Sequence, residues 1–372
     1  MNIFNRENPC KIRLSERARL SGIGSEKEIY KLVFDAKELD YLPGDSLAIF
    51  SRNDFNEVQE ILGLLNLTGD ERVSIKNATF SIRQALIEKY CVTHLTKRFL
   101  STFCELLGKS EKAIFEKVFT DDNDGQYSLL ELLKYFPSVR LTPDELCRLL
   151  KKNAPRFYSI ASAKALQNDK IHLLVRTVGY RNFLGNLRYG VVSHFLNYRL
   201  KIGEYVDAYV SQSSFKLPDD PLANIIMVGP GTGLAPFMSF LYDIESKKKQ
   251  TDIGQTWLFF GDQHEATDFI ERDELTRLLN EHVLTRLDLA FSRDQETKIY
   301  VQDRMWEMRD ELWAWLDQGA SLYICGNASH MAIDVEKVLK NIAIFCGGLT
   351  DNSVEDWLSD LRSNGRYQKD VY

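Results

Sequence analysis

The sequence contains no apolar run that approaches the roughly 20 residues of a membrane-spanning helix, so we expect no membrane insertion. Its opening stretch has no apolar segment of the kind found in secretory signals. A net charge of -6 without a long basic block argues against a nucleic-acid partner. The six cysteines include no Cys-X-X-Cys pair, which disfavours a zinc site and favours free thiols. These absences predict a cytoplasmic protein without a metal site.

The composition is that of a globular protein with hydrophobic cores, because 44% of the residues are hydrophobic and 27% are charged. The length of 372 residues predicts about two or three compact units. A β-rich beginning gives way to helical spacing over residues 54–152, after which strand patterns return. From residue 225 strands alternate with helices, which predicts a parallel sheet covered on both faces. The strands expected in this last region are Ile225–Val228, Trp257–Phe260, Leu287–Phe291 and Leu322–Cys325.

A glycine-rich turn follows the first strand of the expected parallel sheet. Gly229, Gly231 and Gly233 alternate with Pro230 and Thr232, and a helical pattern opens directly afterwards. Glycines at such a turn let the backbone approach a pyrophosphate, and the helix N-terminus supplies N–H donors. No Gly-Lys-Ser/Thr follows, which excludes a triphosphate P-loop. The turn therefore predicts dinucleotide binding, and a tight turn that holds no ligand is the alternative.

A second candidate site follows the strand Leu287–Phe291, where cations and hydroxyls gather. Arginine clamps a phosphate monoester bidentately, lysine adds a point charge, and tyrosine stacks on an adenine, so the set predicts selection of NADPH over NADH. Asp262 is a competing signal, because an acid at the end of a neighbouring strand often binds the ribose hydroxyl of NAD. The larger set outweighs it, although a solvated charged turn would explain any single member. The set is Ser292, Arg293, Lys298, Tyr300 and Gln302.

Several segments carry a resemblance to a known family. Arg156–Ser162 (RFYSIAS) is similar to the RxYSxxS flavin motif of the ferredoxin–NADP reductase superfamily, and Gly190–Ser193 (GVVS) resembles its flavin-diphosphate motif. The likeness runs from about residue 8 to the last residue. The stretches GPGTGLAPF, SRDQETKIYVQD, YICGNASHMAIDVEKVL and RYQKDVY resemble the flavoprotein family of NADPH–sulfite reductase, a branch of the diflavin reductases.

The resemblance implies an α/β plus β fold in three parts. An antiparallel FAD-binding β-barrel is expected over residues 8–53 and 153–218, interrupted by a helical connecting insertion over residues 54–152. A Rossmann-like parallel α/β domain that binds NADPH is expected over residues 219–372, ending in a tail that caps the flavin. FAD and NADPH are the cofactors that this fold implies.

The resemblance also assigns individual residues to the cofactors. Arg156 would neutralise the FAD diphosphate, and Tyr158 would lie against one face of the isoalloxazine ring. Tyr372 would stack on the opposite face, where nicotinamide must arrive, and Asp334 would face the NADPH side. The other FAD positions are Thr93, Phe157, Ser159, Leu174, Val175, Arg176, Tyr180, Gly190, Val191, Val192 and Ser193.

Three positions match the hydride-transfer site of the family. Ser159 would hydrogen-bond flavin N5, Cys325 would pack near nicotinamide C4, and Asp370 would stabilise developing positive charge. Tyr372 completes the catalytic set, because nicotinamide must displace its ring. Each residue also has a plainer interpretation, since a cysteine at a strand end is usually a small buried hydrophobe and a terminal tyrosine is usually frayed.

One departure from the family concerns the electron acceptor. The chain begins at the FAD module, without the flavodoxin-like FMN domain that opens diflavin reductases, yet it retains the helical insertion. In the family this insertion sets the geometry between the FMN and FAD domains. We therefore expect a separate FMN- or flavodoxin-type redox partner that feeds a sulfite-reductase-like system. The alternatives are direct transfer to an iron–sulfur or other acceptor, and a flavin-binding assembly subunit without turnover.

An acidic loop offers one further signal. Thr120–Gly125, followed by Glu131, resembles a calcium-binding EF-hand loop. Threonine stands at the first ligand position and Leu129–Phe136 matches a helix of the family, so no metal site is expected.

Overall fold

The computed structural model describes residues 3–119, 127–182 and 185–372. The chain forms two compact units. The first, which we call the sheet unit, comprises Met1–Ala48, Phe157–Arg176 and Lys201–Tyr372. The second, the helical unit, comprises Ile49–Arg156 and Thr177–Leu200.

A six-stranded sheet with the order β6-β3-β10-β1-β2-β7 forms the first part of the sheet unit. Its β10-β1-β2-β7 portion is antiparallel, and buried residues alternate with more exposed ones along β10, as expected for a strand with one face on a core. An antiparallel bridge between Ile160, just after β6, and Leu173 of β7 closes the sheet into a barrel. The strands are β1 (Cys10–Arg19), β2 (Ile29–Asp35), β3 (Ser46–Ile49), β6 (Arg156–Ser159), β7 (Lys170–Arg176) and β10 (Tyr205–Ser211).

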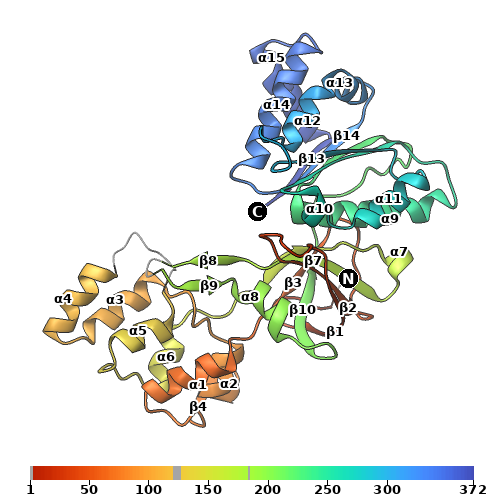
Figure 1. Cartoon of the computed structure of the whole chain (residues 1–372). Coiled ribbons are helices and arrows are strands. Elements are labelled where there is room, and N and C mark those ends of the chain that lie inside the picture. The colour runs from red at the N-terminus through yellow and green to blue at the C-terminus, as the bar shows by residue number, and fades with distance from the viewer. Residues whose placement is uncertain (1–2, 120–126, 183–184) are drawn as a thin grey trace. The chain divides into compact units, whose positions relative to one another are not determined.

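A five-stranded parallel sheet with the order β13-β12-β11-β14-β15 forms the second part of the sheet unit. Helices α9 and α11 cover one face, and α12 to α15 cover the other (Figure 1). The chain order reverses beside β11, which is where open α/β sheets bind ligands at the carboxyl ends of their strands. The strands are β11 (Ile225–Val228), β12 (Thr256–Asp262), β13 (Arg286–Phe291), β14 (Ser321–Gly326) and β15 (Tyr367–Val371). The helices are α9 (Ala235–Lys248), α10 (Glu265–Asp268), α11 (Arg272–Asn280), α12 (Val301–Glu307), α13 (Arg309–Asp317), α14 (Met331–Phe345) and α15 (Asp351–Ser363).

This combination of an antiparallel barrel with a parallel α/β sheet confirms the expected fold class. The four strands expected from residue 225 onward occur as β11 to β14, with bounds that differ by at most two residues. The fifth strand, β15, was not among them. Its sequence YQKDV places three polar residues between two hydrophobic ones, so it lacks the apolar run that marks the other strands.

Short, well-capped helices build the helical unit. Ser128 and Glu131 form a capping box at α5, and Thr142 and Glu145 form another at α6. The buried helix faces enclose a core rich in phenylalanine, in which stacked Phe115 and Phe119 rings lie 5.0 Å apart. The helices are α1 (Phe55–Leu64), α2 (Ile82–Glu88), α3 (Lys97–Glu105), α4 (Lys109–Val118), α5 (Leu129–Tyr135), α6 (Pro143–Leu149) and α8 (Val191–His194), accompanied by the hairpins β4–β5 (Arg72–Ile75, Ala78–Ser81) and β8–β9 (Gly179–Arg181, Leu187–Tyr189).

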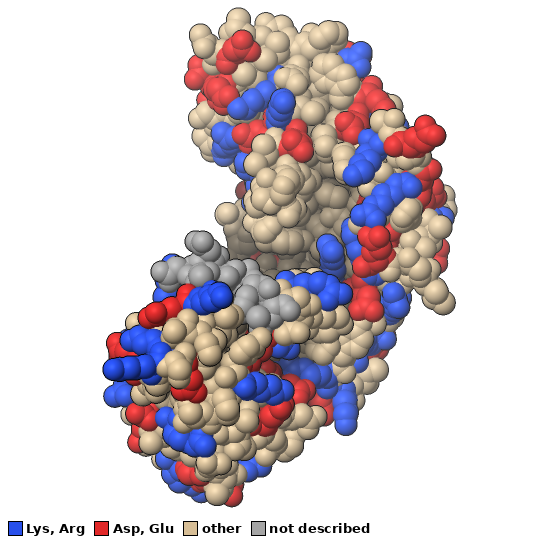
Figure 2. All heavy atoms as spheres, turned by 60° about the vertical axis from the view of Figure 1, so that its left-hand side comes forward, with Lys and Arg blue, Asp and Glu red and all other residues tan. Residues whose placement is uncertain are grey.

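The surface carries charges of both signs. On the face seen in Figure 2, the side chains of Lys and Arg are interspersed with those of Asp and Glu. Elsewhere in the described chain, Lys11 pairs with Asp207 at 3.0 Å and Lys170 pairs with Glu16 at 2.8 Å. Exposed pairs of this kind contribute only about 0–1 kcal/mol each. None of the helices in the described ranges has the length and apolar character needed to cross a membrane.

Because His172 of β7 is buried, we expect the stability of the protein to fall at acid pH. Its Nδ1 is buried and has no hydrogen-bond partner among the described residues. Burial, assisted by the charges of Lys31 and Lys170, lowers the pKa of His172 to about 4, whereas a histidine in an unfolded chain has a pKa of about 6.5. The unfolded chain therefore takes up the proton first, and stability that is present above about pH 6.5 is lost as the pH falls toward 4. We expect the free energy of unfolding to decrease by about 2 kcal/mol between pH 7 and pH 5.

Urea denaturation at the two pH values measures this decrease. His172→Gln should remove most of it, because glutamine does not titrate. His282→Asn is the matched control: His282 is exposed and has a φ of 55°, a conformation that asparagine tolerates. An unchanged pH dependence in His172→Gln would assign the titration to other groups.

Candidate active site

The glycine-rich turn connects the end of β11 to α9. Gly231 has a φ of 58°, in the left-handed region that side chains rarely adopt. A Cβ on Gly233 would lie 2.2 Å from the Cys325 carbonyl oxygen, so glycine allows the turn to pack on the end of β14. Gly229 is likewise packed under the Phe237 ring. The turn thus brings its backbone against the strand that carries Cys325.

Three side chains predicted to act in hydride transfer meet at the ends of β6, β14 and β15. The Ser159 hydroxyl donates a hydrogen bond to Asp370 Oδ2 at 2.8 Å. The Cys325 Sγ lies 3.9 Å from the same oxygen. Cys325 and Asp370 are partners in the parallel ladder of β14 and β15, which fixes their relative position. The carboxylate of Asp370 is therefore shared by a barrel residue and a residue of the parallel sheet.

Cys325 is fully buried and remains a neutral thiol. Burial raises the pKa of Cys325 well above its ordinary value, and the Asp370 carboxylate raises it further. A neutral thiol is neither a nucleophile nor a metal ligand, because the thiolate performs those roles. The cluster therefore suits a site that places a carboxylate beside a bound ring, rather than one that forms a covalent intermediate.

Tyr372 has a fixed backbone, and its hydroxyl has a partner. Its N–H donates to the Gly326 carbonyl oxygen at 3.0 Å, and its own carbonyl oxygen accepts from the Ala328 N–H at 3.0 Å. Its hydroxyl oxygen lies 3.1 Å from Thr232 Oγ1, in the glycine-rich turn. Tyr372 is nevertheless 65% exposed. An aromatic ring in this position can contact a planar ligand near Asp370.

Asp262, the competing signal for NAD, is buried at the end of β12. Its carboxylate forms an ion pair with Lys27, and its side chain is 0% exposed. Burial raises the pKa of Asp262, and Lys27 opposes that rise. A carboxylate enclosed in this way is not presented to a ribose hydroxyl. Ser292 is also buried, and its hydroxyl donates to the Asp262 carbonyl oxygen at 3.3 Å, so it supports the turn after β13.

The other residues predicted to bind phosphate follow β13. Arg293, Lys298 and Tyr300 are exposed, and Gln302 is half-buried. Arg293 Nη1 lies 2.7 Å from a carboxylate oxygen of Glu26, which is itself exposed. An incoming phosphate would compete with this carboxylate for the guanidinium. Asp334, predicted to face NADPH, is exposed in the first turn of α14.

Apart from Tyr372, the FAD residues predicted in the sheet unit lie on β6 and β7. Leu174 and Val175 are buried in the barrel, whereas Arg176 at the end of β7 is exposed. Phe157 is exposed, and its ring stands perpendicular to that of Tyr209 with centroids 6.5 Å apart. Tyr158 is half-buried on the neighbouring position of β6.

In the helical unit, Gly190 joins β9 to α8 through a closed hydrogen-bond network. Its N–H donates to the Val178 carbonyl oxygen at 2.8 Å, and the Val178 N–H donates to Ser193 Oγ at 3.2 Å. The Ser193 hydroxyl then donates to the Gly190 carbonyl oxygen at 3.2 Å. This network fixes the start of a helix, where N–H groups lack acceptors within the helix and suit an anion. Arg156 is exposed, Val191 is half-buried and Val192 is buried.

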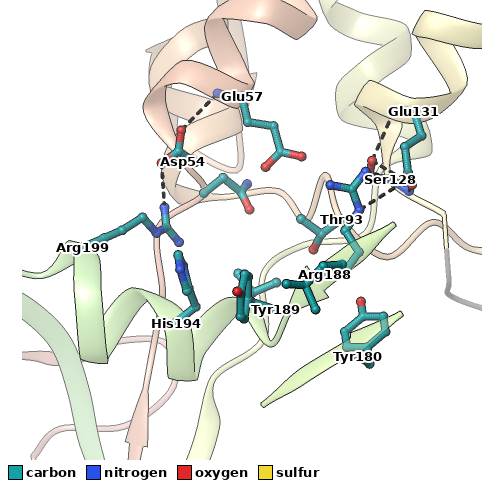
Figure 3. A pocket seen from close by; sticks show the side chains of 13 residues that line it. Asp54, Glu57, Thr93, Ser128, Glu131, Tyr180, Arg188, Tyr189, His194 and Arg199 are labelled. Atoms are coloured by element: carbon teal, nitrogen blue, oxygen red, sulfur yellow. Dashed lines mark hydrogen bonds and ion pairs between the residues drawn. The ribbon is translucent and has the colours of Figure 1, made fainter. Parts of the chain in front are cut away.

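A cavity of about 210 Å³ lies within the helical unit (Figure 3). Thr93, Tyr180 and Val191, three residues predicted to contact FAD, line it. Figure 3 shows Asp54 and Glu57 on one side, both from the start of α1. The other lining residues are Asn53, Ser128, Glu131, Leu187, Arg188, Tyr189, His194 and Arg199.

One wall of the cavity holds a buried carboxylate. Glu131 accepts hydrogen bonds from Arg188 Nε at 3.1 Å, from Asn182 Nδ2 at 2.6 Å and from the Ser128 N–H at 3.0 Å. These donors occupy the oxygens that a calcium ion would need. The acidic loop Thr120–Gly125 itself lies outside the described residues.

Asn53, Asp54 and Glu57 also line the cavity. Asn53 is 4% exposed, and its Oδ1 has no hydrogen-bond partner among the described residues. Burial raises the pKa of Glu57, which favours its protonated form. Arg199 Nη1 lies 3.8 Å from the Asp54 carboxylate.

The structure thus gathers Ser159, Cys325, Asp370 and Tyr372 near the glycine-rich turn, and Thr93 with Tyr180 around the cavity. No motif in the sequence marked the cavity residues at the start of α1 or those of β9 (Leu187, Arg188 and Tyr189). Asn53 and Asp54 carried one local signal, because an Asp before an apolar helical pattern marks a helix start. That signal says nothing about a cavity.

Comparisons with known proteins match both parts of the chain. Residues 2–195 match the family described as FAD binding domain, and residues 227–337 match the oxidoreductase NAD-binding domain family. The sulfite reductase [NADPH] flavoprotein alpha-component of Bacillus subtilis is 38% identical over 378 residues, covering 99% of this chain and 62% of the relative.

Two further relatives carry the same description. That of Vibrio parahaemolyticus is 38% identical over 376 residues, covering 99% of this chain and 59% of the relative. That of Cronobacter sakazakii is 36% identical over 375 residues, covering 99% of this chain and 62% of the relative. The chain therefore spans 59–62% of the length of these curated relatives.

Proposed function

Because this chain belongs to the FAD-binding-domain family and also carries an oxidoreductase NAD-binding domain, we propose that it is an NADPH-dependent FAD reductase. The observation that carries the proposal is the cluster of Ser159, Cys325 and Asp370, which lies beside a dinucleotide-type turn. Relatives described as NADPH flavoproteins support the choice of electron donor. A flavin-binding assembly subunit without turnover would have no use for the cluster, which disfavours that alternative.

The residues present fit FAD. We assign the flavin ring to Tyr158, Ser159 and Tyr372 of the sheet unit. FAD, when bound, supplies the redox chemistry: it accepts a hydride and releases electrons singly.

The chain's own residues orient and screen the reacting rings. Asp370 would stabilise the positive charge that develops on nicotinamide. The Ser159 hydroxyl, which donates to Asp370 in the structure, would donate to a flavin nitrogen instead when FAD is bound. Cys325 supplies an apolar contact that excludes water. Tyr372 would cover the position that nicotinamide must reach, so its ring would have to move before the transfer.

A steady-state assay tests the proposal. The purified protein with FAD should reduce ferricyanide with NADPH much faster than an equal concentration of free FAD does. A rate equal to that of free FAD would refute the reductase function.

For the acceptor, we propose an FMN- or flavodoxin-type redox protein that supplies a sulfite-reductase-like system. The helical unit supports this choice, since the resembled family uses this insertion to position its FMN domain, and the relatives are described as sulfite reductase components. A ferredoxin-type acceptor is the rival. Cytochrome c reduction with added flavodoxin, compared with added ferredoxin, separates the two: faster coupling to ferredoxin would contradict the proposal.

The roles proposed for Arg293 and Lys298 predict how their loss changes the preference for NADPH over NADH. Changing both to Ala should raise the KM for NADPH about tenfold and leave that for NADH unchanged, because a lost contact of about 1.4 kcal/mol to the 2′-phosphate is a factor of ten. Since Glu26 holds the same guanidinium, Glu26→Gln should lower the KM for NADPH. Initial rates with both cofactors provide the measurement.

Lys337→Ala is the matched charge control, because Lys337 is exposed on α14 and belongs to none of the proposed sites. It should leave both KM values unchanged. An unaltered preference for NADPH in the Arg293 and Lys298 double variant would remove these residues from the phosphate site.

A further inference from the structure

Strand β15 carries Asp370 and has a backbone partner on one side. Among the described strands, that partner is β14. Successive side chains of a strand point to opposite faces, so Tyr367 and Lys369 lie on the face opposite to Asp370. The position of Asp370 therefore depends on what holds β15 in addition to this ladder.

Glu336 of α14 holds the opposite face of β15 through one carboxylate oxygen. Its Oε2 accepts a hydrogen bond from the Tyr367 hydroxyl at 2.9 Å and another from Lys369 Nζ at 2.8 Å. Arg362 Nη2 of α15 lies 2.9 Å from the same oxygen. One carboxylate thus connects the strand to the two helices α14 and α15.

The cluster around Glu336 is closely packed and charged. Tyr367 is 4% exposed, and the Arg362 guanidinium and Lys369 Nζ lie 5.3 Å and 5.4 Å from its ring centroid. Burial raises the pKa of Glu336, but hydrogen bonds from its three partners outweigh burial and lower the pKa to about 2. Glu336 is therefore ionised at neutral pH and balances two cations.

A separate contact holds the face that carries Asp370. The Gln368 side chain accepts from the Lys216 N–H at 2.9 Å and donates to the Lys216 carbonyl oxygen at 3.0 Å. Neither these hydrogen bonds nor the ladder with β14 involves Glu336. We therefore expect a variant at Glu336 to keep β15 in the sheet while it loses the carboxylate that holds the opposite face.

The two faces of β15 are coupled because Lys369 and Asp370 are neighbours along the chain. A shift of the backbone at Lys369 moves Asp370 with it. The Asp370 carboxylate accepts from Ser159 at 2.8 Å and lies 3.9 Å from the Cys325 sulfur. A reacting constellation has to be held within about 0.5 Å of its productive geometry, so a small shift is enough to matter.

We propose that Glu336 is a positioning residue for hydride transfer, which fixes the Asp370 carboxylate against Ser159 and Cys325 by holding the opposite face of β15. The inference rests on the proposed function, which gives Asp370 its role. The hydrogen bonds to Glu336 and the alternation of side chains along β15 together carry it.

Hydrogen exchange tests the anchoring without reference to catalysis. In FAD-loaded Glu336→Ala, the amides of residues 367–372 should exchange at least about fivefold faster than in the wild-type protein, because a charged hydrogen-bond acceptor of this strand is lost. The amides of β11 and β12 should keep their wild-type rates. Mass spectrometry of the corresponding peptides provides the measurement.

Stopped-flow absorbance tests the effect on hydride transfer. FAD-loaded Glu336→Ala should reduce its flavin about tenfold more slowly than the wild type at saturating NADPH, because Asp370 is displaced from its place beside the reacting rings. The FAD content should be unchanged, and the KM for NADPH should change by less than about twofold, as expected when a contact made in the transition state is lost. Glu336→Gln keeps an acceptor for Tyr367 without the charge, and its rate should lie between the two.

A double variant shows whether the effect passes through Asp370. In the Asp370→Ala background, the further change Glu336→Ala should slow flavin reduction by less than about twofold, because the carboxylate that Glu336 positions is already absent. A general weakening of the structure would instead slow both backgrounds equally.

Glu355→Gln is the matched control, because Glu355 of α15 forms an ion pair with Lys340 of α14 and so connects the same two helices. It should show wild-type exchange and wild-type flavin reduction. Wild-type exchange in Glu336→Ala would overturn the anchoring. Faster exchange with wild-type flavin reduction, or equal slowing in both backgrounds, would overturn the positioning role. A wild-type protein that does not oxidise NADPH would refute the proposed function, whereas the exchange measurement would still decide the anchoring.

Discussion

Replacing Asp370 with alanine should slow flavin reduction by NADPH about 10- to 100-fold while leaving the FAD content unchanged. The carboxylate accepts a hydrogen bond from Ser159 and lies beside Cys325, so it is the charged member of the proposed hydride-transfer site. Hydrogen bonds and contacts to charged groups contribute about 1.5–3 kcal/mol. Each 1.36 kcal/mol of lost transition-state stabilisation is about a tenfold loss of rate.

Stopped-flow absorbance of the flavin measures this rate directly. Asp370→Asn separates charge from shape, because the amide oxygen still accepts from Ser159 while the negative charge is gone. It should be as slow as Asp370→Ala if the charge matters. Asp360→Ala, at an exposed acid in α15, should reduce at the wild-type rate. A wild-type rate in Asp370→Ala would remove this residue from the mechanism.

Replacing Tyr372 with alanine should narrow the advantage of NADPH over NADH about 30-fold when both are compared at one fixed concentration. Uncovering a large ring from a ligand costs about 2 kcal/mol, which is a factor of about 30. Without the ring, binding of the NADH nicotinamide no longer carries this cost, so turnover with NADH should be faster. With NADPH, the same free energy should appear mainly as tighter binding and slower release of NADP, because the phosphate already supplies affinity.

Turnover with each cofactor and the release rate of NADP are the measurements. Phe345→Ala is a suitable control, because Phe345 is also 65% exposed and, as the last residue of α14, belongs to none of the proposed sites. Its preference for NADPH should equal that of the wild type. An unaltered preference in Tyr372→Ala would show that the ring only packs against its surroundings.

The parallel sheet was predictable because its buried strands are apolar runs. The strands β11, β12 and β14 are buried along their whole length, so periodicity and flanking turns mark them well. The edge strand β15 carries polar residues and was found only in the structure. The hairpin β4–β5 was also missed, because it lies within a region whose dominant signal is helical.

The candidate site divides in the same way. The glycine turn and the Ser159, Cys325 and Asp370 set follow from local motifs and from a family resemblance that extends along the chain. The roles of these residues stay predictions. Arg188 and Glu57 line one cavity although they are far apart in the sequence, and no local pattern indicates such a pairing. The ion pair of Asp262 with Lys27 is likewise a tertiary contact. It buries a carboxylate that the sequence alone made a candidate for binding a ribose hydroxyl.

Because β15 lies at the edge of the parallel sheet, we expect heating to affect activity before it unfolds the protein. The strand spans five residues, and among the described strands it pairs with β14 alone. Segments with few partners open locally at a lower free energy than the global unfolding of the protein. When β15 frays, Asp370 and the backbone hydrogen bonds of Tyr372 leave together, while the rest of the sheet persists. Inactivation on warming would therefore begin below the melting temperature and would reverse on cooling.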